Sequence, residues 1–291
     1  MKQKLIKLIT SDNIELAGIL YEPEEKTNTI IIHVHGLAGN FYENSFIDYQ
    51  AKAYTEAGIS YLVMNNRGNG YFTDLIKKEN NQVTYVEGGA AFETMNGSIK
   101  DIDTSVNYTE SLGYTDIILQ GHSFGCNKVA YYYGNKPNKK ISKIILLAPC
   151  DMVGLRIKEL GKEYSEYVVK AKELISIEQD KALLNYPDFP PFDVSAKTFI
   201  DIYTWDCPND IFRYRDLEFI SPILSNIKIP VLIQIGNNDE YSLSTDKNII
   251  TRYLEKNIEN SRIIYIKDTN HGYIGKEQEM SENCVSYIKN N

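Results

Sequence analysis

The stretch Asp116–Val129, which reads DIILQGHSFGCNKV, decides the fold of this chain. Residues 117–119 form an apolar run typical of a buried strand, and Cys126–Tyr133 has the pattern of a helix. The Gly-His-Ser-Phe-Gly turn between them matches G-x-S-x-G, which places a serine on a sharp strand-to-helix turn. Its two glycines allow a tight turn that side chains would obstruct. We therefore expect the hydroxyl of Ser123 to stand clear of a sheet, where the positive end of the following helix favours an oxyanion.

Length and composition describe an ordinary globular protein. The chain has 291 residues, 43% of them hydrophobic and 24% charged, which fits one large α/β domain or a core with an insertion. Its net charge of −8 argues against non-specific binding to nucleic acid or to anionic membranes. The first ten residues are typical of a strand and not of a signal peptide, and no run approaches the roughly 18 apolar residues of a membrane span. The four widely spaced cysteines predict free thiols and a cytoplasmic location.

Short apolar runs alternate with helical patterns along most of the chain. The predicted strands are Lys4–Thr10, Ile14–Tyr21, Thr29–His35, Ile59–Met64, the run at 117–119, Ile141–Ala148, Pro230–Ile235 and Arg262–Ile266. Helices are expected around residues 46–57, over Ser98–Leu112, Cys126–Tyr133 and Ser244–Leu254, and at the C-terminus. This order predicts a mainly parallel sheet that begins with an antiparallel hairpin.

Two segments interrupt this alternation. Tyr71–Asn96 has polar runs and a Gly-Gly pair and matches no regular element, and segments of such length are often functional. Residues 150–221 contain a charged helical stretch and an aromatic stretch around Trp205, and they carry no strand-helix repeat. We interpret residues 150–221 as a mostly helical cap, inserted into a core made of residues 1–149 and 222–291.

A serine needs a base to remove its proton, and histidine suits this role because its pKa lies near neutrality. Of the four histidines, His33 lies inside a predicted strand, His35 suits a structural role in its loop, and His122 adjoins the serine on a sharp turn. His271 follows the last predicted strand in a polar loop, from which it can reach the serine.

The base in turn needs a carboxylate on its second ring nitrogen. Asp239 comes directly after a predicted strand and is the first candidate. Glu240, Asp268 and Asp151 remain open as alternatives.

The order Ser123, Asp239, His271 resembles that of the α/β-hydrolase superfamily. The resemblance spans nearly the whole chain: a hairpin start, a His-Gly loop, the serine turn, an insertion after the next strand, the acid and then the histidine. It implies a mostly parallel eight-stranded sheet flanked by helices, with an inserted helical cap. It also implies that Ser123 is the nucleophile, His271 the base and Asp239 its partner, and that the backbone N–H groups of Leu37 and Phe124 form the oxyanion hole.

A narrower resemblance concerns the substrate. The insertion and the HGLAG loop at residues 35–39 are similar to those of feruloyl or cinnamoyl esterases, and residues 113–151 resemble the siderophore-esterase branch. The loop Asn65–Gly70 departs from the Asp-x-x-Gly-x-Gly-x-Ser pattern common in the superfamily, because Asn65, Asn66 and Tyr71 replace the expected residues.

We therefore expect a serine hydrolase that cleaves a small-molecule ester through an acyl-enzyme, without a cofactor or metal and without nucleic-acid or membrane partners. A thioesterase or a peptidase would use the same three residues. A non-catalytic binding protein with this fold is the alternative from another class.

Overall fold

The computed structural model describes residues 1–185, 193–242 and 245–290. In this part of the chain, eight strands form one sheet in the order β1-β2-β4-β3-β7-β8-β11-β12. The six strands from β4 to β12 run parallel, whereas β2 pairs antiparallel with both β1 and β4. Their bounds are β1 Lys2–Ile9, β2 Glu15–Glu22, β3 Thr29–Val34, β4 Ser60–Met64, β7 Asp116–His122, β8 Ile141–Leu147, β11 Val231–Gly236 and β12 Ser261–Ile266. The predicted eight-stranded, mostly parallel sheet with an antiparallel start is confirmed.

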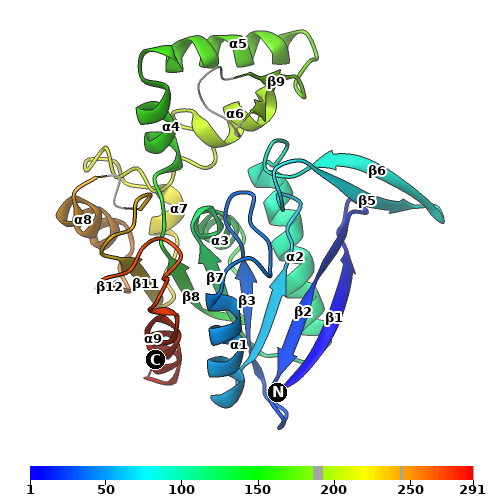
Figure 1. Ribbon diagram of the computed structural model, residues 1–291, viewed down its shortest axis with the longest axis vertical. Coiled ribbons are helices and arrows are strands. Elements are labelled where there is room, and N and C mark those ends of the chain that lie inside the picture. The colour runs from blue at the N-terminus through cyan, green and yellow to red at the C-terminus, as the bar shows by residue number, and fades with distance from the viewer. Residues whose placement is uncertain (186–192, 243–244, 291) are drawn as a thin grey trace.

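Helices cover both faces of this sheet, as Figure 1 shows. Helices α1 (Phe46–Glu56) and α9 (Glu277–Asn290) pack against one face. Helices α2 (Met95–Ser111), α3 (Phe124–Asn135) and α8 (Lys247–Asn257) pack against the other, together with the short α7 (Pro222–Ser225). Because both faces are covered, strands such as β3 are apolar nearly throughout. Ser244, where the sequence predicts the start of α8, lies outside the described residues.

A mostly helical segment lies between β8 and β11 and stands above the sheet (Figure 1). It consists of α4 Met152–Leu160, the short 3-10 helix η1 Gly161–Glu163, α5 Tyr164–Ser176, β9 Leu183–Leu184, β10 Val194–Ser195 and α6 Ala196–Tyr203. These elements share a hydrophobic cluster of their own, to which Phe124 and Met95 contribute from below. Ile211, Phe212 and Tyr214 belong instead to the hydrophobic cluster between the sheet and helices α2, α3 and α8.

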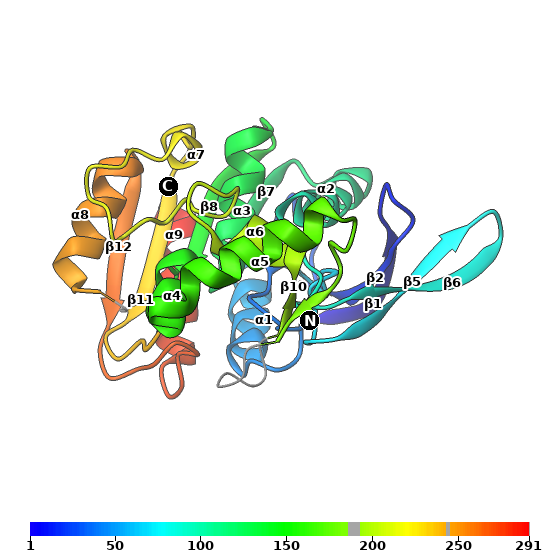
Figure 2. The same cartoon turned by 90° about the horizontal axis from the view of Figure 1, so that it is seen from above.

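The segment that has no predicted structure, Tyr71–Asn96, contains a β-hairpin. Strands β5 (Thr73–Glu79) and β6 (Gln82–Gly88) pair antiparallel and form a separate two-stranded sheet, which extends past β1 and β2 in Figure 2. Most of β6 is exposed, which explains why the sequence shows no alternation between apolar and polar residues. Across the described ranges, no helix combines the length and the apolar character that a membrane span requires.

Candidate active site

Ser123 occupies the sharp turn between β7 and α3, at the centre of the sheet. Its backbone has φ 55° and ψ −128°, a conformation that is costly for a side-chain-bearing residue and persists only when the surroundings impose it. The packing of two glycines imposes it here. A Cβ at Gly121 would lie 2.4 Å from the carbonyl carbon of Gly125, and one at Gly125 would lie 2.1 Å from the carbonyl oxygen of Val34. The glycines of the GHSFG motif are therefore required by close backbone contacts on both sides of the serine.

His271 and Asp239 form the hydrogen-bonded pair expected from their positions. The Nδ1 of His271 lies 2.9 Å from both carboxylate oxygens of Asp239. Asp239 is buried, and its Oδ1 also accepts the backbone N–H groups of Tyr241 and Ser242 at 3.0 and 2.7 Å. Burial by itself raises the pKa of Asp239, but the hydrogen bonds from His271 and Ser242 outweigh it, so this pKa lies below its ordinary value. The carboxylate is thus charged at neutral pH and fixes one nitrogen of the imidazole, which leaves Nε2 for the cavity.

The three alternative acids lie elsewhere. Glu240 is exposed and accepts the backbone N–H of His271 at 3.3 Å. Asp151 caps the N-terminus of α4 by accepting the N–H of Gly154 and forms an ion pair with Arg215. Asp268 is exposed in the turn after β12. Among the four candidates, Asp239 is the one whose carboxylate holds the His271 ring.

The remaining histidines are buried, and two of them hold loops of the site. The Nε2 of His122 lies 2.9 Å from the carbonyl oxygen of His271, and the two rings are 4.9 Å apart. Burial and the neighbouring His271 lower the pKa of His122 to about 3, so His122 is neutral and its Nε2–H donates to that carbonyl. His122 therefore supports the loop that carries His271, a contact that could not be predicted from the sequence. His33 contacts Gln120 in the core.

The loop after β3 brings Gly36 and Leu37 against the serine. A Cβ at Gly36 would lie 2.9 Å from the Cβ and 3.3 Å from the Oγ of Ser123, so only glycine leaves this approach open. His35 holds the loop: its Nδ1 lies 2.9 Å from the carbonyl oxygen of Gly36, and its Nε2 accepts the N–H of Asn66 at 2.9 Å. Burial and the charge of Lys128 lower the pKa of His35 to about 3, which keeps the ring neutral and suited to both hydrogen bonds.

Phe124 is the first residue of α3, so its N–H is one of those that have no acceptor within the helix. Below it, a fully buried ion pair joins Lys128 of α3 to Glu93, with Nζ and Oε1 2.6 Å apart. The ammonium group of Lys128 also lies 4.6 Å from the centre of the Phe124 ring. The start of α3 is thereby fixed to the segment that precedes α2.

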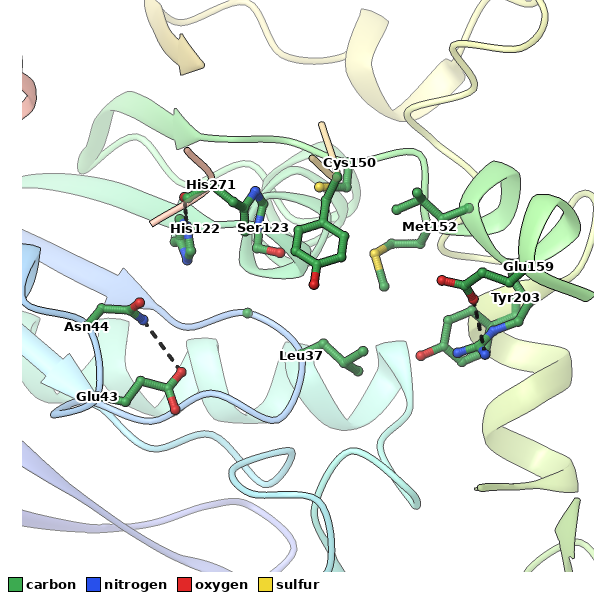
Figure 3. Close-up of a pocket in the computed structure, with 14 residues that line it drawn as sticks. Leu37, Glu43, Asn44, His122, Ser123, Cys150, Met152, Glu159, Tyr203 and His271 are labelled. Atoms are coloured by element: carbon green, nitrogen blue, oxygen red, sulfur yellow. Dashed lines mark hydrogen bonds and ion pairs between the residues drawn. The ribbon is translucent and has the colours of Figure 1, made fainter. Parts of the chain in front are cut away.

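A cavity of about 320 Å³ contains both Ser123 and His271, as Figure 3 shows. Its wall brings together the serine turn, the loop after β3, the loop after β11 and helix α4. The lining residues are Gly36, Leu37, Glu43, Asn44, His122, Ser123, Cys150, Met152, Leu155, Arg156, Glu159, Tyr203, Tyr241 and His271. Burial raises the pKa of the Cys150 thiol well above its ordinary value, so this neighbour of the serine is uncharged. No group of three or more His, Cys, Asp or Glu in the described ranges is arranged to hold a metal ion.

Several lining residues could not be found from the sequence. The residues of α4 that face the cavity carry no motif, and their helical periodicity does not reveal which face meets the serine. Trp205, which the sequence singles out in the insertion, lies outside this cavity and stacks on Arg215 at 4.1 Å. Tyr203, two residues earlier, is the aromatic residue of α6 that lines it.

Residues 29–271 match the family model described as alpha/beta hydrolase fold. No curated protein sequence gives a significant match. A structure of Est1E from Butyrivibrio proteoclasticus with bound ferulic acid is similar, with 18% identity, coverage of 97% of this chain and 98% of that chain, and a TM-score of 0.69.

Two further solved structures share the fold at similar coverage. GrgF, an α/β hydrolase from Penicillium sp. sh18, has 15% identity, coverage of 100% and 99% of the two chains, and a TM-score of 0.68. The esterase domain of a Rhodothermus marinus protein has 11% identity, coverage of 100% and 99%, and a TM-score of 0.62. At these identities the structural likeness shows the fold, whereas the family model covers most of the chain. The chain therefore belongs to the alpha/beta hydrolase fold family.

Proposed function

We propose that this protein is a serine hydrolase that cleaves a carboxylic ester of a small molecule through an acyl-enzyme intermediate. One observation carries the proposal: Ser123, on a strained turn, lines the same cavity as His271, whose ring is held by Asp239. A nucleophile, a base and an orienting acid in this arrangement are what acyl transfer requires.

In the proposed reaction, His271 Nε2 removes the proton of Ser123 Oγ as the oxygen attacks the ester carbonyl. The backbone N–H groups of Leu37 and Phe124 stabilise the negative charge that develops on the carbonyl oxygen. The C–O bond to the alcohol then breaks, and the imidazolium returns its proton to the leaving oxygen. Water, deprotonated by His271, next attacks the acyl-enzyme and releases the acid and Ser123. Asp239 keeps its charge throughout and stabilises the imidazolium.

Supporting observations come from the surroundings of the site. The Gly36 and His35 contacts hold the loop that carries Leu37 against Ser123. Residues 150–221 serve in this proposal as a cap, because α4 and α6 supply one wall of the cavity. Similar structures include an esterase domain and an Est1E complex with ferulic acid, both of which favour an ester as the substrate class. The four cysteines are free, as the cytoplasmic location that we propose requires.

The test is hydrolysis of p-nitrophenyl esters of increasing acyl length by the wild type and by Ser123→Ala. We expect turnover on at least one ester and a loss of several orders of magnitude in the variant. Labelling by a fluorophosphonate probe provides a second measurement, since only an activated serine reacts. A protein that neither hydrolyses the esters nor labels would be a binding protein, and the proposal would be wrong. Matched thioesters and anilides in the same assay separate an esterase from a thioesterase or a peptidase.

A further inference from the structure

The cavity has two ends of different character, with Ser123 and His271 between them (Figure 3). Glu43 and Asn44, from the loop after β3, lie at one end. Toward the other end, Leu37 and Met152 come first, and Glu159 and Tyr203 lie beyond them. We call the part of the cavity from Ser123 to Glu159 and Tyr203 the arm. One part of an ester bound at the serine would extend along this arm, first past apolar side chains and then to polar groups.

Helix α4 builds this arm with a single face. Met152, Leu155, Arg156 and Glu159 all line the cavity, and their spacing of three and four residues puts them on one side of the helix. The side chain of Asp151 accepts the N–H of Gly154 at 2.7 Å, which fixes the start of α4 directly after the strand that neighbours β7. The polar end of the arm is therefore held at a set distance from the serine.

Arg156 and Glu159, which we call the distal pair, carry opposite charges at this end. The guanidinium Nη1 lies 3.2 Å from the Glu159 Oε2. The Arg156 side chain is only 4% exposed and its guanidinium stacks over the Tyr203 ring, with Cζ 4.4 Å from the ring centre, so its position is fixed. The Glu159 side chain, 29% exposed, is the more accessible partner. Burial raises the pKa of Glu159, although the charge of Arg156 opposes this shift.

An ion pair at the end of an apolar arm favours some polar groups of a ligand over others. A ligand carboxylate would have to displace Glu159 from Arg156. An ammonium group could contact Glu159 only while it lies close to the like charge of the guanidinium, whose Nη1 is 3.2 Å from that carboxylate. A hydroxyl group can accept a hydrogen bond from Arg156 and donate one to Glu159 while the pair stays intact, and hydrogen bonds to charged groups are the stronger ones.

We propose that the distal pair recognises an uncharged hydroxyl group at the tip of the substrate, so that Arg156 and Glu159 determine specificity for hydroxyl-terminated esters. This inference rests on the proposed hydrolase function and narrows its substrate class. The part of the ester that enters the arm is an apolar stem with one polar end. A stem that ends in a methyl group makes no hydrogen bond with Arg156 or Glu159. The loss of these hydrogen bonds makes the methyl-tipped ester a poorer substrate than the hydroxyl-tipped one.

The test compares substrates that differ only at the tip. One series consists of p-nitrophenyl esters of hexanoate, ω-hydroxyhexanoate, ω-aminohexanoate and the adipate half-ester. A second series varies the alcohol in the same way in acetate esters, because either part of the ester could enter the arm. In one of the two series we expect kcat/KM to be at least about tenfold higher for the hydroxyl tip than for the methyl tip, with both charged tips below the hydroxyl.

Two variants test the assignment to the distal pair. Arg156→Met should reduce the hydroxyl-to-methyl ratio of kcat/KM to about one. Glu159→Gln keeps an acceptor but removes the negative charge, so it should raise the relative kcat/KM of the adipate half-ester, an effect that loss of folding cannot produce. Lys158→Met, an exposed position on the same helix outside the cavity lining, is the matched control and should keep the wild-type ratios.

The outcomes separate this inference from the function on which it rests. A wild type that labels with a fluorophosphonate and hydrolyses plain hexanoate esters, but shows no hydroxyl preference in either series, overturns the role of the distal pair alone. The same holds if Arg156→Met retains the preference, or if a charged tip is preferred by the wild type. A wild type without labelling or turnover on any ester overturns the proposed hydrolase and this inference together.

Discussion

Replacement of Asp239 by asparagine removes one negative charge from the contact with His271 and keeps the shape of the side chain. In the wild type, both carboxylate oxygens lie 2.9 Å from Nδ1 and can accept its proton. The N–H groups of Tyr241 and Ser242 both donate to Oδ1, so they would hold the amide oxygen of the variant at that position. The amide NH2 group would then occupy the place of Oδ2, 2.9 Å from Nδ1.

The position of this amide NH2 group determines how much kcat is lost. A donor beside Nδ1 favours the tautomer in which Nδ1 carries no proton and Nε2 carries one, and that tautomer cannot accept the proton of Ser123. The imidazolium that forms during the reaction would also lose its counter-charge. In a serine–histidine–aspartate arrangement these losses together lower kcat by about a thousandfold to ten-thousandfold, which corresponds to about 4–5.5 kcal/mol of the barrier.

The assay is steady-state hydrolysis of the best p-nitrophenyl ester at slightly alkaline pH, with the rate of fluorophosphonate labelling as a second readout. Glu240→Gln is the matched control, because this exposed acid accepts the backbone N–H of His271, and its variant should stay within about fivefold of the wild type. Thermal unfolding shows whether Asp239→Asn is folded. A folded Asp239→Asn protein that keeps a tenth or more of the wild-type kcat would show that Asp239 does not orient and stabilise His271 as described.

Three further predictions concern stability. Gly121→Ala puts a Cβ 2.4 Å from the backbone of α3, so urea titration should show a loss of roughly 3 kcal/mol or more of the free energy of unfolding, and a loss below about 1 kcal/mol would contradict the packing. Lys128→Met leaves Glu93 buried without its counter-ion and should lower the free energy of unfolding by about 3–5 kcal/mol. The double variant Lys128→Met/Glu93→Leu should recover most of this loss. Equal losses in the single and double variants would count against the ion pair. Burial raises the pKa of Asp12 but hydrogen bonds from Arg67 lower it more, so the folded-state pKa is depressed and the carboxylate stabilises the protein above about pH 4. The difference in Tm between wild type and Asp12→Asn should therefore be present at neutral pH and shrink as the pH falls below about 4, and a gap that does not change with pH would be the contrary result.

The sheet could be predicted from the sequence because its physical signals are local. Buried parallel strands such as β3 and β8 are continuous apolar runs, and the GHSFG turn has few alternatives for its backbone. The convergence of Ser123, Asp239 and His271 follows from the same pattern, since each comes after a strand and the carboxyl ends of parallel strands meet at one edge of a sheet.

Helix bounds were less well predicted. Helix α3 begins at Phe124 and α2 at Met95, two and three residues before the positions expected from periodicity. In α2, Thr94 caps the helix by accepting the N–H of Gly97, a signal that is present in the sequence. Local periodicity identifies the apolar centre of a helix better than its ends.

The rest of the site depends on contacts between segments that are distant in the chain. The β5–β6 hairpin has too few buried residues to show a period, and it is held at one end by a hydrogen bond from Lys78 N–H to the carbonyl oxygen of Asn13. The distal pair lies at the cavity only because α4 begins directly after β8 and turns one face toward Ser123. Neither the position of the hairpin nor that of the distal pair can be predicted from the local sequence.

Mass spectrometry of the protein quenched during ester turnover is the sharpest test of an acyl-enzyme on Ser123. We expect a mass increase equal to one acyl group on the peptide that contains Ser123, and no such adduct in Ser123→Ala. Turnover without an adduct, an adduct on another residue, or wild-type turnover by Ser123→Ala would contradict this expectation.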